Sequence, residues 1–174
     1  MNLRNEKALQ DFEQAARHFC SLLETDPVDK NEWLKKVLAA LASLYANAHQ
    51  IPDYGLPENA VEPPKNYDVS DEEYAAVTKR VSRILGERSK YWTYFDPTIT
   101  NDPAEKPIAG ALWDDLGDIY RDVKPGLNAW ATGRDEYLHS TAFDWRWPLF
   151  EVHWGRHALD AMRALHQLAF DQGI

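Results

Sequence analysis

Two histidines with metal-ligand spacing lie near the end of the chain. His153 and His157 are four residues apart in a segment of helical pattern, which places both imidazoles on one side of a helix, within reach of one metal ion. Asp160 follows one turn later on the same side and is a candidate third ligand. The residues between the histidines lack the glutamate of a metalloprotease motif. The alternative, which we favour from sequence, makes His157 a hydrogen-bonded residue at the core edge and leaves His153 exposed.

A second group of chemically capable residues consists of four aspartates. On a helical wheel Asp114 points away from the apolar face, Asp118 lies on its outer flank, and Asp115 and Asp122 lie at its boundary. Carboxylates from paired helices can hold Mg²⁺ for phosphate chemistry, so Asp115, Asp118 and Asp122 form a second candidate metal set. The sequence does not indicate which second helix would complete this set. We therefore favour a solvated acidic face with ion pairs at its edges.

Aromatic residues form a third group, because the chain contains seven tryptophans, and five of them lie beyond residue 112. Tryptophan offers a large packing area with an N–H that needs a partner, and clusters of it line ligand pockets and protein contacts. The candidate binding residues are Trp145, Trp147, Trp154 and Tyr120. The alternative, again favoured, is that the tryptophans are core residues.

Helical periodicity dominates the segments that must position these side chains. Apolar residues recur every three to four positions in segments that predict helices over 5–25, 30–49, 70–86, 108–130 and 135–170. Pro125-Gly126 predicts a kink or break near Val123, and Pro148 predicts a bend or split in the last helical region. Residues 91–97 read as coil or a short strand. The prediction is an all-α, single-domain bundle of five or six helices over residues 1–174.

A long proline-rich loop, residues 50–69, follows the second predicted helix. It holds four prolines, and loops of this length are often functional. Amphipathic bundles often dimerise, so a homodimer is a further expectation.

Composition and charge exclude several classes of function. The formal net charge is −9, opposite in sign to that of proteins that bind nucleic-acid backbones. The longest apolar stretch, Val37 to Ala42, is far shorter than the roughly 20 residues of a membrane span. Cys20 is the only cysteine, which excludes an internal disulfide, and the first residues lack the apolar core of a signal peptide. We therefore expect a cytoplasmic protein that binds neither nucleic acid nor membrane.

Five segments, taken in order, form a combined pattern: Phe95-Asp96-Pro97, Pro107 to Leu112, Asp114 to Asp122, His153 to His157 and Ala161 to His166. Together they resemble the bacterial domain of unknown function family DUF5063. The resemblance extends from about Phe12 to His166 and implies a bacterial, cytoplasmic, helical single domain with no assigned activity and no catalytic residues. The family pattern runs helically through the stretch that holds Pro125-Gly126 here.

Two functions remain open from the sequence. The favoured one is a non-enzymatic helical module without a cofactor, which binds a protein partner or a small ligand through residues 50–69 or a groove edged by Trp145 and Trp147. The alternative is a metal-dependent hydrolase that acts on a phosphate compound and uses a divalent ion. Convergence of His153, His157 and the aspartates of residues 114–122 in one pocket would favour the enzyme.

Overall fold

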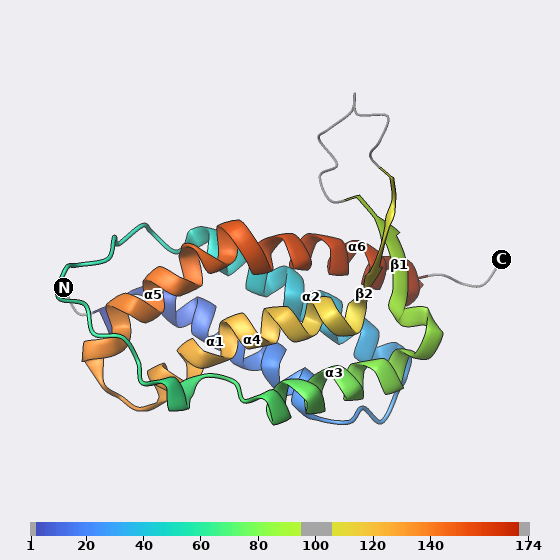
Figure 1. Ribbon diagram of the computed structural model, residues 1–174, viewed down its shortest axis with the longest axis horizontal. Coiled ribbons are helices and arrows are strands. Elements are labelled where there is room, and N and C mark those ends of the chain that lie inside the picture. The colour runs from blue at the N-terminus through green and yellow to red at the C-terminus, as the bar shows by residue number, and fades with distance from the viewer. Residues whose placement is uncertain (1–2, 95–105, 171–174) are drawn as a thin grey trace.

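The fold is a bundle of six α-helices with one short β-hairpin, seen in a computed structural model that describes residues 3–94 and 106–170 (Figure 1). This confirms the predicted helical architecture. The helices are α1 (Lys7–Glu24), α2 (Lys30–Gln50), α3 (Asp71–Leu85), α4 (Leu112–Ala131), α5 (Leu138–Arg146) and α6 (Gly155–Phe170). The strands are β1 (Lys90–Thr93) and β2 (Ile108–Ala111).

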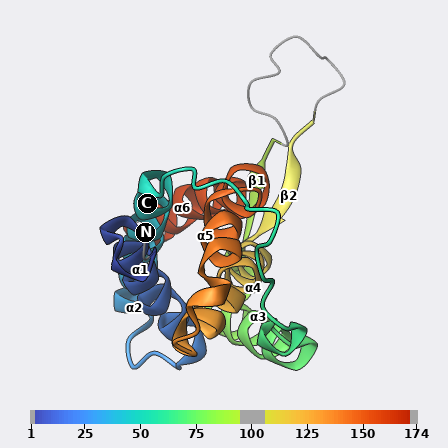
Figure 2. The same ribbon diagram turned by 90° about the vertical axis from the view of Figure 1, so that its left-hand side faces the viewer.

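Helix α4 is the central element of the bundle and packs against α1, α3, α5 and α6. Helices α1 and α2 pack against each other on one side, and α3 covers the opposite side, as the end view shows (Figure 2). The apolar stripes of the helices meet in one continuous core, in which Leu9, Phe12, Leu41, Leu116 and Trp154 are fully buried. Burial of these stripes is the main stabilising term of such a fold.

The hairpin replaces the first turn that the sequence predicted for the fourth helix. Residues 108–111 form β2, which pairs antiparallel with β1 in the register Lys90↔Ala111 to Thr93↔Ile108, so a helix beginning at Ile108 was wrong. The ring of Tyr91 lies so close to Gly110 that a Cβ there would be 2.6 Å from it. Glycine therefore permits this contact. The strand predicted within 91–97 is confirmed as far as Thr93, and residues 95–97 lie outside the described residues.

Helix α4 runs without interruption through Pro125, so of the kink or break predicted near Val123 the break was wrong. The proline removes only the amide that would bond to the carbonyl of Arg121. Gly126 lies where Trp145 of α5 approaches α4, and a Cβ at Gly126 would lie 2.3 Å from the indole nitrogen. That nitrogen donates to the carbonyl of Val123 at 3.2 Å. The Pro-Gly pair therefore marks a close helix–helix contact.

Pro148 divides the last helical region, as predicted. Helix α5 ends at Arg146, and one segment of π-helix, Leu149–Trp154, leads into α6. Single π-helical turns are rare and often occur at functional sites. His153 lies in this one.

The proline-rich loop wraps around the end of the bundle opposite the hairpin (Figure 1). Two side chains tie it down: Ser140 donates to the carbonyl of Val61, and Asn128 donates to that of Tyr67. Among the described helices, none is long and apolar enough to cross a membrane.

Candidate metal centre

Helix α4, the π-helical segment Leu149–Trp154 and α6 bring Asp118, His153 and His157 together. Each residue offers one ligand atom, a ring nitrogen or a carboxylate oxygen, and the three atoms lie within 4.8 Å of one another. The two imidazole rings stand edge to face with centroids 4.9 Å apart. The i, i+4 spacing across the junction of the π-helical segment and α6 places both histidines on the side that faces α4.

Each histidine holds a carboxylate of α4 at its Nδ1 atom. The Nδ1 atom of His153 is 2.5 Å from Oδ2 of Asp122, and that of His157 is 2.8 Å from Oδ1 of Asp115. A carboxylate at Nδ1 favours the tautomer protonated there, which leaves the lone pair on Nε2. Both rings are therefore arranged as metal-ligating histidines usually are.

Asp118 has one oxygen held by protein groups and one that faces the histidines. Oδ1 accepts hydrogen bonds from the Tyr74 hydroxyl at 3.1 Å and from the Arg121 guanidinium at 2.8 Å. Oδ2 lies 3.7 Å from Nε2 of His157. Ligand atoms around a tetrahedral zinc ion are about 3.4 Å apart, so a small contraction would allow both atoms to bind one ion.

Burial and mutual charge alter the acidity of the groups around this centre. The hydrogen bond to Asp115 raises the pKa of His157 above its ordinary value, although burial opposes it. Burial raises the pKa of Asp122, and the hydrogen bond to His153 opposes this increase. The hydroxyl of Tyr91 donates to Oδ2 of Asp115 at 2.5 Å, and its own pKa is raised by burial. Tyr91, Asp115 and His157 thus form a continuous hydrogen-bonded chain.

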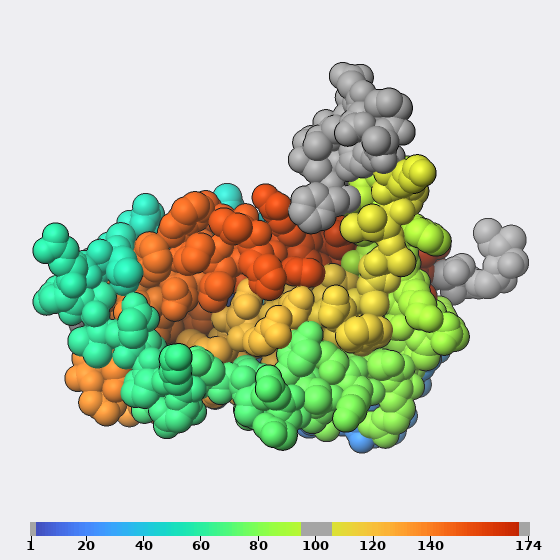
Figure 3. Space-filling view, in the orientation of Figure 1, coloured from blue at the N-terminus to red at the C-terminus, as the bar shows by residue number. Residues whose placement is uncertain are grey.

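A cavity of about 520 Å³ adjoins the two histidines. It lies between α4, α6 and the hairpin, which meet on the face seen in Figure 3. Its walls include Trp113, Tyr91 and Val152 together with the charged residues Arg156 and Asp160. Within the part of the chain that is described, Arg156 makes no ion pair, whereas Asp160 accepts a hydrogen bond from Thr93 at 2.9 Å. The cavity is large enough for a small organic molecule.

The structure combines one part of each metal set that the sequence suggested. His153 and His157 meet Asp118, while Asp160 is occupied by Thr93 and is not part of the three-residue group. A solvated acidic face was wrong for α4, because the side chains of Asp115, Asp118 and Asp122 are only 9%, 13% and 13% exposed. Each of these aspartates contacts α3, α6 or the π-helical segment, which a helical wheel of one helix does not contain.

Three residues of the site were not singled out from the sequence. Tyr91 and Tyr74 hold Asp115 and Asp118 through their hydroxyls, and Arg121 pairs with Asp118. The only local signal is the i, i+3 spacing of Asp118 and Arg121, which is typical of an ordinary surface ion pair. Tyr74 and Tyr91 lie on other elements, and nothing in their spacing connects them to α4.

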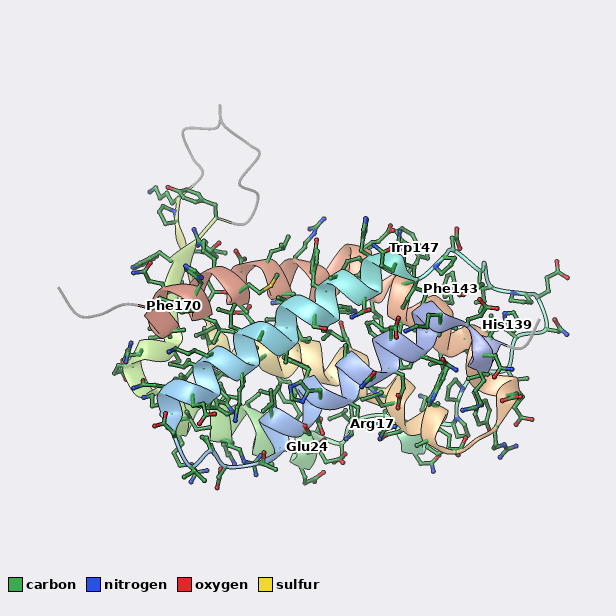
Figure 4. The ribbon with its side chains drawn as sticks, turned by 180° about the vertical axis from the view of Figure 1, so that it is seen from behind. Arg17, Glu24, His139, Phe143, Trp147 and Phe170 are labelled. Carbon is green, nitrogen blue, oxygen red and sulfur yellow. The ribbon has the colours of Figure 1, made fainter. Side chains whose placement is uncertain are left out.

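The candidate aromatic binding residues lie in different environments. Trp145 and Trp154 are buried in the core, as the favoured alternative predicted. Tyr120 is also buried, and its hydroxyl donates to Glu24 of α1 at 2.8 Å. Trp147 is exposed, and its backbone N–H donates to the carbonyl of Phe143; both residues lie in the half of the molecule away from the β-hairpin (Figure 4).

Comparison with known proteins identifies the family of this chain but no activity. A solved structure of protein BF1032 from Bacteroides fragilis is similar over 98% of both chains, with a TM-score of 0.78 and 23% sequence identity, which shows a shared fold. No curated protein sequence matches the chain. The sequence model of the family described as "Domain of unknown function (DUF5063)" matches residues 4–171. This chain therefore belongs to the DUF5063 family, the family that the ordered segments of the sequence resemble.

Proposed function

We propose that this protein binds a divalent transition-metal ion through Asp118, His153 and His157 and uses it to hydrolyse a small phosphate compound. The observation that carries the proposal is that each of the three proposed ligands is hydrogen-bonded through the side-chain atom that would not bind the ion. Asp122 and Asp115 take the Nδ1 atoms of the histidines, and Tyr74 with Arg121 takes Oδ1 of Asp118. Such outer partners orient ligands before the ion arrives and are typical of protein metal sites.

The ligand types favour zinc, manganese or iron over magnesium. Imidazole nitrogens suit transition metals, whereas magnesium prefers an all-oxygen environment. Three protein ligands also leave a position open for water or substrate, as catalytic zinc sites do. An ion bound there would polarise a phosphoryl oxygen and lower the pKa of a bound water.

The cavity residues support a phosphate substrate. Arg156 supplies a cation that lacks a carboxylate partner among the described residues and matches the geometry of a phosphate group. Asp160 lies on the same cavity wall and is suited to accept a proton from an attacking water. Trp113 and Val152 provide an apolar surface for the organic part of the substrate.

Metal binding is the first test of this function. Purified protein is titrated with Zn²⁺, Mn²⁺ and Mg²⁺ while its melting temperature and heat of binding are measured, and we expect one tight site for Zn²⁺ or Mn²⁺. His153→Ala should abolish that site. His166→Ala removes an exposed histidine of α6 and should leave binding unchanged. Absence of binding by the wild-type protein would refute the proposal.

Catalysis is tested separately on the metal-loaded protein. We expect hydrolysis of p-nitrophenyl phosphate or pyrophosphate that depends on the metal, with Arg156→Ala raising KM more than it lowers kcat. A tight metal site without hydrolysis of any phosphate ester or anhydride would limit the function to metal-dependent ligand binding.

A non-enzymatic contact module is the second candidate, and exposed aromatic residues favour it. Trp92 on the hairpin is 70% exposed and Trp147 is 45% exposed, both unusual for tryptophan. If they form contacts with a protein partner, Trp92→Ala or Trp147→Ala should weaken its capture without lowering the melting temperature. Unchanged capture by both variants would contradict this function.

A further inference from the structure

A second, smaller cavity lies on the other side of Asp122, away from the candidate metal centre. Its volume is about 200 Å³, and it is enclosed by the proline-rich loop, α4 and α5. Pro63, Pro125, Trp145 and Leu149 form its apolar walls. The segments that enclose it lie at the loop-covered end of the bundle in Figure 1.

One wall of this cavity carries a buried hydroxyl group without a partner. Thr141 of α5 is only 2% exposed, and its Oγ1 atom has no hydrogen-bond partner. Buried polar side-chain atoms in folded proteins nearly always have a partner. Since Thr141 lines the cavity, a polar group inside it is the natural partner.

Asp144 lies one turn further along α5 and is a carboxyl group without a countercharge. Among the described residues it forms no ion pair and no hydrogen bond, although it is partly buried. Burial, and to a lesser degree the charge of Glu62 on the loop, raises its pKa to about 6. Both causes act against a bare negative charge, so a cation in the cavity would be stabilised there.

The other charged groups that face the cavity do not supply this cation. Arg121 is the only basic residue in the lining, but its guanidinium pairs with Asp118 and lies over the ring of Tyr74. Asp68 and Asp122 add further negative charge. The cavity therefore presents an acidic interior with apolar walls.

A bare metal ion does not fit this arrangement. In the described residues, the only group of three acidic or histidine side chains close enough to share an ion is the one at the candidate metal centre. An ammonium group needs fewer negatively charged partners than a metal ion does, and its partners can lie further apart, because its three N–H groups donate to separate acceptors. The apolar walls suit an attached carbon chain.

We propose that this cavity binds the ammonium group of a small alkylamine, with Asp144 as the countercharge and Thr141 as a second acceptor. The chain of the amine lies against Trp145, Leu149 and Pro63. This site shares Arg121 and Asp122 with the surroundings of the candidate metal centre, but it uses neither the metal ligands nor the larger cavity.

The indole N–H of Trp145 provides a direct probe, because it lines the cavity and is fixed on the carbonyl of Val123. The protein is titrated with butylammonium while the NMR signal of this N–H is followed. We expect a saturable shift with butylammonium and none with butyrate or 1-butanol. The two control compounds share the carbon chain but lack the positive charge.

Two substitutions test the assigned contacts. Asp144→Asn preserves shape and should weaken binding at least tenfold, and Thr141→Val, which removes only the hydroxyl, should weaken it severalfold. Glu87→Gln removes an exposed charge just before β1, at the hairpin end of the molecule, and should leave binding unchanged. Circular dichroism of each variant verifies folding, and Thr141→Val remains informative if Asp144→Asn fails to fold.

Several outcomes would overturn the proposal. Equal binding of butylammonium by wild type and both cavity variants would show only attraction to an acidic surface. No saturable shift with butylammonium would exclude the amine site. A shift with MgCl₂ that depends on Asp144, with none for butylammonium, would make the cavity a site for a hydrated metal ion instead.

Discussion

Replacement of Asp122 isolates the role of a partner that touches a proposed ligand but not the ion. Asp122 bonds to Nδ1 of His153 over 2.5 Å, and its side chain is 13% exposed, so water competes weakly with this contact. Asp122→Asn keeps an oxygen at this position and removes the charge. Asp122→Ala removes both the charge and the atom that orients the ring.

The expected magnitude follows from the type of hydrogen bond that is lost. A hydrogen bond to a charged group contributes about 1.5–3 kcal/mol, and one between neutral groups contributes about 0.5–1.5 kcal/mol. Asp122→Asn should therefore lose about 1–1.5 kcal/mol of the interaction that holds the His153 ring. This corresponds to about tenfold weaker metal binding, since 1.4 kcal/mol is tenfold. Asp122→Ala also frees the imidazole ring of His153. Its metal affinity should therefore fall by about 100-fold, the largest loss usual for residues that orient metal ligands.

A competition titration against a chromophoric zinc chelator measures these changes directly. Asp160→Asn is the matched control, because Asp160 lines the same cavity but bonds to Thr93 and touches neither histidine. It should leave zinc affinity unchanged. If Asp160→Asn weakens zinc binding and Asp122→Asn does not, the assignment of ligands and partners is wrong.

Three further predictions concern packing and pH. Gly126→Ala places a Cβ 2.3 Å from the Trp145 indole nitrogen. The free energy of unfolding, measured with urea, should fall by about 1–2 kcal/mol, a net value that includes the higher helix propensity of alanine. An unchanged free energy of unfolding would contradict this contact. Trp145→Ala should cost about 3–5 kcal/mol because the ring is buried, whereas exposed Trp147→Ala should change the free energy of unfolding by less than about 1 kcal/mol; similar losses would contradict these placements. The pKa of Asp144, about 6 against 3.8 ordinarily, means that its contribution to stability is present below pH 3.8 and is lost as the pH rises through 6. Asp144→Asn should therefore stabilise the protein at neutral pH by about 1 kcal/mol, discounted for partial exposure to water, and give no gain below pH 3.8 in urea titrations; a gain independent of pH would contradict this reasoning.

Most of the helical architecture could be predicted from local sequence. Residue 70 begins the capping box of α3, in which Ser70 accepts from the amide of Glu73 and the Glu73 carboxylate accepts from the amide of Ser70. Such a signal needs only neighbouring residues. The β-hairpin and the unbroken α4 were harder to predict. Gly110 and Gly126 lie against the rings of Tyr91 and Trp145, and these two aromatic residues are distant from the glycines in sequence.

The candidate site was visible only in fragments. The spacing of His153 and His157 indicated a shared helix face, and the aspartates of α4 were recognised as a group. In the structure Asp118, in place of the predicted Asp160, lies close to both histidines. A helical wheel gives the direction of a side chain relative to its own axis, but not which neighbouring helix covers that direction.

The helical periods, the start and stop signals and the residue types available for metal chemistry could be read from the chain alone, because they depend on backbone geometry within a few residues. Which segments cover the aspartates of α4 depended on the packing of distant parts of the chain: the π-helical segment and α6 lie over them, and Tyr74 and Tyr91 reach them from α3 and β1. Packing between distant segments removes water from those carboxylates and makes each of them a hydrogen-bonded partner. The same side chains on an isolated helix would be a solvated acidic face.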